Sequence, residues 1–431
     1  MKPEPLSVYV HIPFCTLKCS YCDFNSYAGI EVLMRPFVDA LCDELRLWGG
    51  VLAQGWGPEP HIGRHVVETV FFGGGTPSLL PLKEVERIMA AMREAFDLMP
   101  GAEVSFEANP GTIECDYFRG LLAAGVNRIS FGVQSFYDDE LAALDRIHSA
   151  AEAKQAYRWA REAGFERVNL DLIYGLQEQT MDRWQSTLEQ AIALAPEHLS
   201  LYALTVEEGT KLAHDIERGR APAPDGDVQA EMYEWSCEWL ESAGYRQYEI
   251  SNWCRPGEEC RHNLVYWRNG EWLGLGPGAH SHLWSQEQGA RGQGWRFADV
   301  YSPKRYIELV RETVAIGARS QESGVRDTGT REMVGLMRQV AFVEELAVEM
   351  EMADTAILGL RLNEGLKVDE FRGRFGRSLD EVYGPVLAET AAFGLVEREN
   401  GPVRLTERGR LLANEVFVRL LANEVFVRLL V

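Results

Sequence analysis

The first half of the chain alternates between short apolar runs and longer amphipathic stretches, and this alternation limits the folds available to it. The predicted strands cover residues 6–12, 66–72, 102–108, 126–132, 167–173 and 198–202. The predicted helices between them cover residues 35–48, 81–96, 114–124, 150–163 and 181–194. Strands joined by crossover helices run parallel. Six units are fewer than the eight of a closed barrel, so the sequence predicts an α/β fold with a partial (β/α)6 barrel of the TIM type.

The rest of the chain is predicted to form two further parts. A Pro- and Gly-rich stretch at 219–226 ends the core, which we assign to residues 1–218. Residues 219–300 form an extension with a helix at 228–243 followed by a Gly-, Trp- and His-rich region. Residues 301–431 are expected to be a mostly helical C-terminal domain. Within it, strands at 394–398 and 403–405 around Asn400-Gly401 indicate a winged-helix-like unit.

The tail contains an internal repeat, because residues 410–418 recur as 419–427. Nine residues turn a helix by about two and a half turns, so the two copies face opposite sides. Only one copy can therefore pack on a shared core. The other is an exposed apolar helix, a partner contact or an error in the sequence, and we assign it no function.

Charge and hydropathy exclude some classes of function. The chain has 43 Lys and Arg against 65 Asp and Glu, a formal net charge of −22. Such a balance repels phosphate backbones and anionic lipid surfaces, which disfavours nucleic acid and membranes as partners. No apolar run approaches the roughly 18 residues of a membrane span, and residues 1–5 lack a signal-peptide pattern. We expect a cytoplasmic protein without a membrane span.

Three of the 8 cysteines follow the first predicted strand directly, in His11-Ile-Pro-Phe-Cys15-Thr-Leu-Lys-Cys19-Ser-Tyr-Cys22. The C-x3-C-x2-C spacing suits three corners of a [4Fe–4S] cluster, whose fourth iron stays open to an exchangeable ligand. Structural zinc is one alternative, although it favours four ligands and paired C-x2-C spacing. An inert buried trio is the other. The remaining cysteines are expected to be structural.

Polar or small residues also follow the ends of successive predicted strands, where the sites of parallel α/β folds collect. In chain order they are Gly74, Gly75, Thr76, Glu107, Gln134, Arg146 and Asp171. Glycines allow a close backbone approach, with free N–H and C=O groups for an amino acid head. The carboxylates can accept from hydroxyls or an ammonium, and Arg146 can meet a carboxylate. Singly, each would be a capping or salt-bridging residue; together they indicate one cleft.

The cysteine motif resembles the signature of radical S-adenosylmethionine proteins. The strand-end residues, with Tyr9, resemble the S-adenosylmethionine site of the oxygen-independent coproporphyrinogen III dehydrogenase group, over residues 6 to about 420. The resemblance implies that Cys15, Cys19 and Cys22 hold the cluster and that the methionyl group chelates its open iron. It also implies that a reductant such as flavodoxin or ferredoxin supplies an electron, and that the reduced cluster can cleave S-adenosylmethionine to a 5′-deoxyadenosyl radical. The residues implied to bind S-adenosylmethionine are Tyr9, Gly74, Gly75, Thr76, Glu107, Gln134, Arg146 and Asp171.

That group contains two branches, the dehydrogenases and a branch of haem chaperones, which differ at one cysteine position and in an N-terminal extension. The dehydrogenases carry a fourth cysteine two residues after the third, and an N-terminal extension. Here Phe24 stands at the cysteine position, and the first strand begins near residue 6. The HemW haem chaperones instead show C-x3-C-x2-C-x-F and a His-Asn-x-x-Tyr-Trp motif, to which His262-Asn263-Leu264-Val265-Tyr266-Trp267 is similar. The sequence therefore resembles the chaperone branch.

The second motif has chemistry suited to haem. The neutral imidazole of His262 is a good axial iron ligand, Asn263 can orient it, and Tyr266 and Trp267 supply flat apolar surface. A hydrogen-bonded core network beneath the barrel mouth is the alternative. Further candidate iron ligands lie nearby in sequence: Cys260, His280 and His282.

The resemblance to the chaperones implies a protein that binds haem as cargo and passes it to acceptor haemoproteins such as respiratory enzymes. The enzyme alternative is the dehydrogenase itself, which decarboxylates coproporphyrinogen III oxidatively to protoporphyrinogen IX. A radical enzyme acting on RNA is disfavoured by the net charge of −22. A scaffold that only retains the cluster is disfavoured because the S-adenosylmethionine residues are all present.

Overall fold

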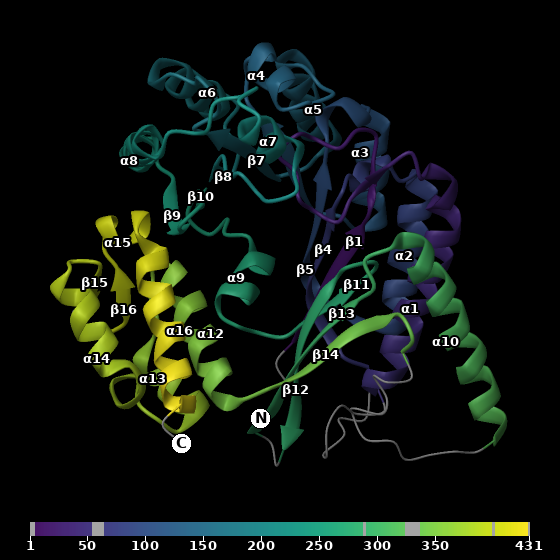
Figure 1. Ribbon diagram of the computed structural model, residues 1–431. Helices are drawn as coiled ribbons and strands as arrows, with labels where there is room; N and C mark the ends of the chain where they lie inside the picture. Colours follow the sequence, from purple (N-terminus) through teal and green to yellow (C-terminus); the bar gives the residue numbers. More distant parts are fainter. Residues whose placement is uncertain (1–4, 54–63, 288–289, 324–336, 399–400, 430–431) are drawn as a thin grey trace.

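A 12-stranded curved sheet dominates the computed structural model, which describes residues 5–53, 64–287, 290–323, 337–398 and 401–429 (Figure 1). The central strands are parallel neighbours in the order in which they occur along the chain. They are β1 (Leu6–Ile12), β4 (Val66–Gly74), β5 (Asp97–Ala108), β6 (Arg128–Gln134), β7 (Arg167–Tyr174) and β8 (His198–Ala203). The predicted partial barrel of six parallel strands is confirmed.

Helices connect these strands and cover the outer side of the sheet (Figure 1). They are α1 (Met34–Ala53), α2 (Leu82–Ala95), α3 (Cys115–Ala124), α4 (Asp138–Ala143), α5 (Ala150–Ala163) and α6 (Met181–Ala193), and α7 (Lys211–Glu217) and α8 (Gly226–Ser242) follow β8. Their ends follow local signals. Ser149 and Glu152 form a capping box before α5, and Gly164 ends that helix at φ +109°.

The extension adds strands to both edges of the sheet. Beyond β8 lie β10 (Asn252–Cys254) and β9 (Arg246–Glu249), both antiparallel to their neighbours. On the other side β11 (Trp272–Leu275) runs parallel to β1, and an antiparallel ribbon continues outward from it. The ribbon consists of β12 (His280–Glu287), β13 (Ala290–Asp299) and β14 (Val340–Leu346). The expectation that the chain beyond 300 is helical was wrong for β14, whose pairing partner β13 is distant in sequence.

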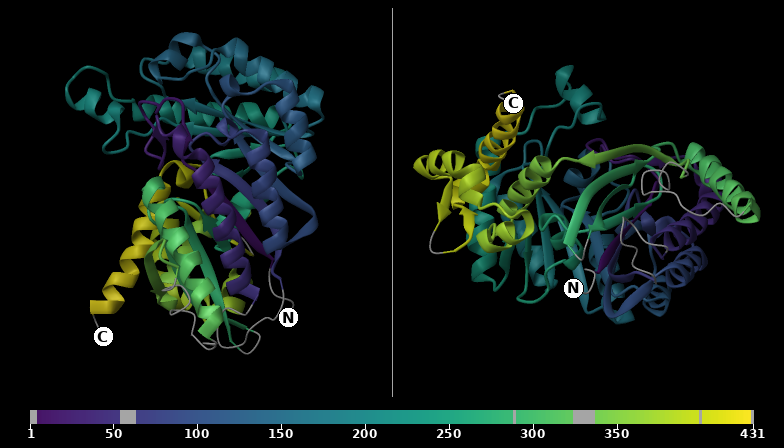
Figure 2. Two further views of the ribbon diagram at one scale, coloured as in Figure 1. Left: turned by 90° about the vertical axis from the view of Figure 1, so that its right-hand side faces the viewer. Right: turned by 90° about the horizontal axis from the view of Figure 1, so that it is seen from below.

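The described residues form two large hydrophobic cores and a small third cluster around Leu176. The first contains the barrel, the ribbon and α10 (Pro303–Ser323), and the second begins at Met352. The second core belongs to a C-terminal lobe with the elements α12 (Val348–Arg361), α13 (Val368–Phe375), α14 (Leu379–Ala392), β15 (Val396–Arg398), β16 (Val403–Leu405), α15 (Glu407–Leu411) and α16 (Ala413–Leu429). The β15–β16 hairpin after two helices has the predicted winged-helix-like form; its turn residue Asn400 lies outside the described residues. Figure 2 shows this lobe beside the barrel from two further sides.

Helix α16 contains residues 413–418 of the first copy of the tail repeat and the whole of the second copy. Val416 and Phe417 of the first copy are buried in the C-terminal core, as is Leu420. The side chains beyond residue 422 lie outside the described residues, so the predicted orientation of the second copy stays a prediction.

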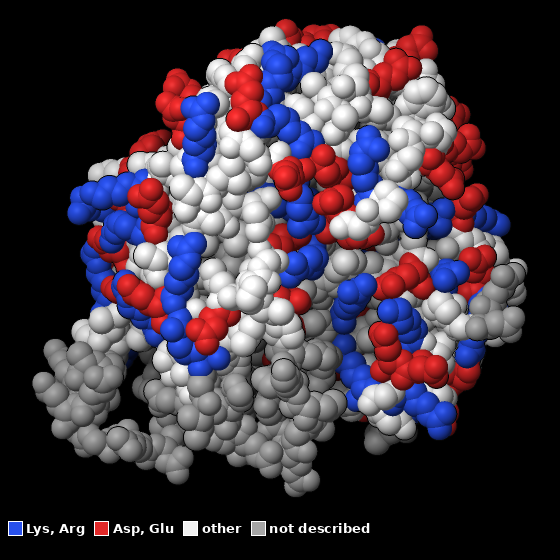
Figure 3. All heavy atoms as spheres, turned by 180° about the vertical axis from the view of Figure 1, so that it is seen from behind, with Lys and Arg blue, Asp and Glu red and all other residues white. Residues whose placement is uncertain are grey.

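The described surface and helices bear on the expected partners. Basic and acidic side chains intermingle over the face shown in Figure 3 and do not gather into a field of one sign. None of the helices in the described part of the chain is long and apolar enough to cross a membrane.

Candidate functional site

The three clustered cysteines lie in and after a short strand at the carboxyl end of β1. Cys15 is in β2 (Phe14–Cys15), which pairs with β3 (Tyr27–Ala28). The loop between these strands carries Cys19 and Cys22, and the Cys22 N–H donates to the Cys19 carbonyl at 3.2 Å. A paired strand at each end thus closes the cysteine loop.

Asn25 fastens this loop to the barrel and to the extension. Its side-chain amide donates to the carbonyl oxygens of Pro277 (2.8 Å) and Tyr301 (2.9 Å). Its own carbonyl oxygen lies 2.9 Å from His11 Nε2. The loop is therefore held by contacts that do not involve the cysteines.

A cavity of about 410 Å³ opens beside the loop, at the carboxyl ends of the strands. All three cysteines line it, as do most of the strand-end residues singled out in the sequence. Those residues are Gly74, Gly75, Thr76, Glu107, Gln134, Arg146 and Asp171. The structure therefore brings the predicted cluster ligands and predicted S-adenosylmethionine residues to one cavity, with one exception.

The exception is Tyr9, which does not belong to the lining of this cavity. Its hydroxyl lies 3.0 Å from His11 Nδ1, and its ring stacks on Phe71. His11 in turn lies directly against Gly74, where an added Cβ would come within 2.5 Å of the imidazole. Tyr9 therefore supports the glycine turn from below.

The glycine turn also has a structural role. Gly74 has φ +109°, and a Cβ on Gly75 would come within 2.6 Å of the Phe14 carbonyl oxygen and 3.1 Å of Cys15 Sγ. The Gly75 and Thr76 N–H groups donate to the carbonyls of Ile12 (2.8 Å) and Phe14 (2.7 Å). The sequence analysis expected N–H groups here that are free for a ligand. In the structure these two amides are used within the chain, where they hold β2, and with it Cys15, against the barrel.

Two carboxyl groups face the cavity from neighbouring regions of the sheet. Burial raises the pKa of Glu107 to about 8, and the negative charge of Asp171 raises it further. The hydrogen bond from the Gly74 N–H and the positive charge of Arg128 lower the pKa, but by less. Burial also raises the pKa of Asp171, although Ser130 and Asn169 donate hydrogen bonds to it at 3.1 and 2.8 Å. Both groups are thus poised for a positively charged or hydroxyl-bearing ligand, which would stabilise their ionised forms.

Arg146 supplies a buried positive charge to the cavity. Its guanidinium donates to the Gly132 carbonyl at 2.7 Å and lies 3.5 Å from Cys19 Sγ. Its Nε is buried and has no hydrogen-bond partner among the described residues. A buried donor without a partner is unfavourable and points to a ligand with an acceptor group, such as a carboxylate.

Gln134 enters the cavity from a strained position. Its φ is +69°, in the left-handed region that residues with a side chain rarely adopt, and it lies at the end of β6. Strained residues of this kind gather at binding sites, where the surrounding fold holds them in place.

The lining also includes residues that the sequence analysis missed, namely Asn109, Tyr202 and Thr205. Tyr202 is in β8, the sixth parallel strand. The sequence analysis looked for polar or small residues at the strand ends. Including aromatic residues at the end of the sixth strand would have identified Tyr202.

The second motif forms α9 (Arg261–Trp267), which closes the amino end of the barrel. His262 is buried: its Nδ1 lies 2.8 Å from Thr69 Oγ1, and its Nε2 lies 2.8 Å from the Tyr266 hydroxyl. Burial lowers the pKa of His262 to about 3, so the imidazole is neutral. Because both ring nitrogens are engaged, an iron ligand at Nε2 would have to displace the Tyr266 hydroxyl.

The remaining motif residues and the further candidate iron ligands each have their own contacts. Trp267 points to the far side of α9, against Arg361 (4.4 Å from the ring centroid), and Asn263 is half-buried. Cys260 is buried against Glu103. His282 is buried between the Gly270 carbonyl and Glu351, whereas His280 is exposed. The structure does not bring these groups to the cysteine-lined cavity.

The donor set fits a [4Fe–4S] cluster with S-adenosylmethionine beside it. Three thiol side chains border one cavity, next to a buried guanidinium with an unused donor and two carboxyl groups of raised pKa. The cysteines would hold three irons, and the methionyl carboxylate would meet Arg146.

Comparison with known proteins agrees with this assignment. Residues 60–191 match the Radical SAM superfamily, and residues 346–412 match the HemN C-terminal domain. A solved structure of coproporphyrinogen III oxidase (HemN) from Escherichia coli, described as a radical SAM enzyme, superimposes with a TM-score of 0.77 at 24% identity, covering 96% of this chain and 90% of that one. At this identity the likeness shows the fold. Fold and site together define a radical S-adenosylmethionine protein, a class that implies a [4Fe–4S] cluster and S-adenosylmethionine as cofactors.

Closer relatives specify the family. A protein of Mycobacterium tuberculosis named heme chaperone HemW is 38% identical over 419 residues, covering 96% of this chain and 95% of the relative. Its namesake in Bacillus subtilis is 34% identical over 414 residues, covering 95% and 98%. The namesake in Escherichia coli is 43% identical over 285 residues, covering 66% and 71%. The chain therefore belongs to the HemW family.

Proposed function

We propose that this chain is a cytoplasmic haem chaperone that binds haem and delivers it to acceptor haemoproteins such as respiratory enzymes. The observation that carries the proposal is its 38% identity to a protein named heme chaperone HemW over 96% of the chain. The structure adds support, because Phe24 stands two residues beyond Cys22, at the rim of the cysteine-lined cavity. A phenylalanine there cannot supply the further thiolate expected of a dehydrogenase.

In this proposal the residues of the chain divide into two sets. Cys15, Cys19 and Cys22 hold the cluster, and Arg146 and Glu107 orient S-adenosylmethionine beside it. When bound and reduced by a flavodoxin or ferredoxin, the cluster supplies an electron for cleavage of S-adenosylmethionine. The remaining binding residues in this set are Gly74, Gly75, Thr76, Gln134 and Asp171, with Tyr9 supporting the turn.

The second set is α9, which we propose contacts haem. Trp267 offers its indole surface, while His262 and Tyr266 act by holding α9 against Thr69 of β4. Asn263 is partly accessible on the same helix. His262 is thus a positioning residue, whose removal would loosen the surface that carries Trp267.

The test is anaerobic reconstitution with iron and sulfide, followed by a haem titration read from the Soret band. The haem-loaded protein is then mixed with an apo-haemoprotein, and transfer is followed by the acceptor's own spectrum. Saturable binding and transfer are expected. Absence of saturable binding, or conversion of coproporphyrinogen III to protoporphyrinogen IX, would overturn the proposal.

A further inference from the structure

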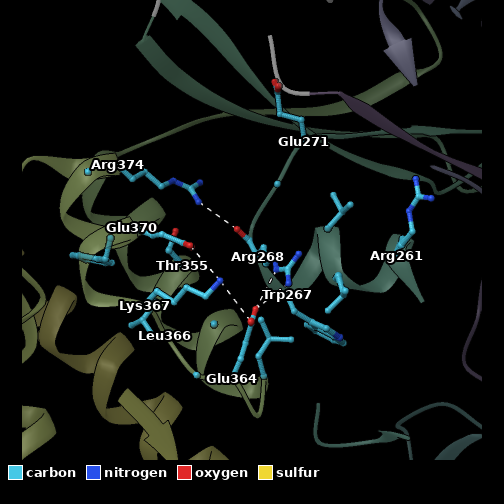
Figure 4. Close-up of a pocket in the computed structure, with 18 of the residues that line it drawn as sticks. Arg261, Trp267, Arg268, Glu271, Thr355, Glu364, Leu366, Lys367, Glu370 and Arg374 are labelled. Atoms are coloured by element: carbon cyan, nitrogen blue, oxygen red, sulfur yellow. Dashed lines mark hydrogen bonds and ion pairs between the residues drawn. The ribbon is translucent and has the colours of Figure 1, made fainter. Parts of the chain in front are cut away.

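A second and larger cavity, of about 800 Å³, lies between α9 and the C-terminal lobe (Figure 4). One wall comes from the outer face of α9, with Leu264, Val265, Trp267 and Arg268. The facing wall comes from α12, α13 and the turn between them. Its volume falls within the roughly 300–1,000 Å³ of pockets for drug-sized ligands, which occur preferentially at domain interfaces.

The helix α9 separates this cavity from the barrel interior. Residues four apart share a face of a helix, so His262 and Tyr266 point together at β4, where His262 meets Thr69. Trp267 and Arg268 point the other way and line the cavity. The motif therefore has a structural face and a face that borders open space.

Part of the cavity wall is apolar. Leu264 and Val265 oppose Leu366 and Phe371 of the lobe. Such a wall suits a flat apolar ligand more than a compact polar one.

One edge of the cavity carries basic groups paired with exposed carboxylates. Arg268 lies 3.0 Å from Glu364, and Lys367 lies 3.5 Å from Glu364 and 3.2 Å from Glu370. In Figure 4 Arg268 and Lys367 converge on Glu364. These side chains are 39–71% exposed, and such pairs are weak and exchange readily with other carboxylates.

The whole lining is close to electroneutral. Its basic residues are Arg261, Arg268, Lys367 and Arg374, and its acidic residues are Glu68, Glu271, Glu364 and Glu370. A polyphosphate would bring more negative charge than this wall can match. A flat apolar ligand with carboxylates on one edge could take the place of the Glu364 carboxylate beside Arg268 and Lys367. The two basic groups would then form as many ion pairs as before.

We propose that this cavity is the haem-docking site, with the macrocycle against Trp267 of α9 and the propionates at Arg268 and Lys367. This assignment rests on the proposed function, because it takes haem as the cargo. The described lining residues include no His, Cys, Met or Tyr. Haem is therefore held by its ring and propionates, with the iron open to a ligand from the acceptor.

The first test fills the cavity. Gly373 lines it on α13, and an added Cβ there would meet no atom within 4 Å. Gly373→Ala therefore meets no clash and is the matched small variant, and Gly373→Trp places an indole at the cavity, with its fold checked by circular dichroism. We expect the tryptophan variant to lose haem affinity at least about tenfold, and the alanine variant to bind like the wild type.

The second test separates ring from propionates. Arg268→Ala/Lys367→Ala should weaken haem binding about tenfold, since it removes charge-assisted hydrogen bonds. The same variant should bind haem dimethyl ester as the wild type does. The control is Arg372→Ala, an exposed arginine of α13 outside the lining. Cluster content, measured as iron per chain, should be unchanged in every variant.

The outcomes distinguish this site from the proposed function. If the wild type binds no haem, the proposed function fails. If the wild type binds haem and both Gly373→Trp and the double variant bind it equally well, the chaperone stands and this docking site is wrong. A loss of ester binding equal to the loss of haem binding would overturn the assignment of the propionates.

Discussion

Glu103 and Glu107 lie on the same strand, β5, four residues apart, at opposite ends of the barrel. Glu103 accepts from Arg167 (2.8 Å) and from the N–H groups of Arg261 (3.2 Å) and His262 (3.1 Å). Burial alone would raise its pKa, but Arg128, Arg167 and these N–H groups bring the pKa below its usual value. Glu107 lies at the open end, where burial and the charge of Asp171 raise its pKa. Only the Gly74 N–H and Arg128 lower it, and the pKa rises to about 8.

This difference distinguishes the structural end of the barrel from the end that binds a ligand. At the amino end, α9 supplies hydrogen-bond partners for Glu103 and Thr69, so these buried groups are matched within the chain. At the carboxyl end the groups are buried but incompletely matched, as Arg146 Nε and Glu107 show. Buried polar groups that lack partners are rare in folded proteins, and here they identify where a ligand completes the network.

The largest expected effect concerns the cysteines of the two ends. Cys19→Ser should abolish the [4Fe–4S] cluster after reconstitution, because three thiolates are the minimum set that the cavity offers. Cys260→Ser, at the closed end, should retain the wild-type iron and sulfide content. Iron analysis and the visible absorption of the cluster measure both, and a full cluster in Cys19→Ser would remove this loop from the assignment.

Next in size is the stability of the two glutamate variants. Glu103→Gln should lower the free energy of unfolding by about 3 kcal/mol, since it leaves Arg128 and Arg167 without their shared carboxylate. Glu107→Gln should not lower it at pH 7, because the folded chain keeps Glu107 mostly protonated while the unfolded chain ionises it, and a neutral amide avoids the loss of stability that this difference causes. Urea unfolding of the apoprotein provides the comparison. Equal losses would mean that both ends are structural.

A smaller effect is the pH dependence of the open end. Between 4.5, the ordinary pKa of Glu107, and its folded value of about 8, the folded chain keeps a proton that the unfolded chain has released. The contribution of Glu107 to stability therefore falls as pH rises through this window. Glu107→Gln should flatten that decline in thermal unfolding measured from pH 5 to 8. An unchanged slope in the variant would assign the decline to other groups.

The smallest effect tests the role of His262. His262→Ala and Thr69→Val both loosen the contact between α9 and β4, and each should weaken haem binding a few-fold, as loss of one buried hydrogen bond does. The Soret maximum should stay in place, because His262 does not ligate the iron in this scheme. A shifted Soret band in His262→Ala alone, with Thr69→Val like the wild type, would make His262 an iron ligand.

Local patterns made much of the fold predictable from the sequence. The six parallel strands are short runs rich in β-branched and apolar residues, and Cys15, Cys19 and Cys22 lie within eight residues of one another. The ribbon of β12–β14 was not predicted, since its pairing joins distant segments and its exposed β14 side chains lack a strong pattern. The second cavity was beyond reach for the same reason: Arg268 and Glu364, whose side chains meet there, are separated by 96 residues.

The contacts of Asn25 have a consequence for the life of the cofactor. In a classical zinc finger the metal orders the chain, and removing it unfolds the domain. Here the hydrogen bonds to Pro277 and Tyr301 and the pairing of β2 with β3 give the cysteine loop its shape without iron. A chain that loses its cluster to oxygen therefore keeps the conformation of the cysteine loop. A new cluster can then be assembled from iron and sulfide without refolding of the chain.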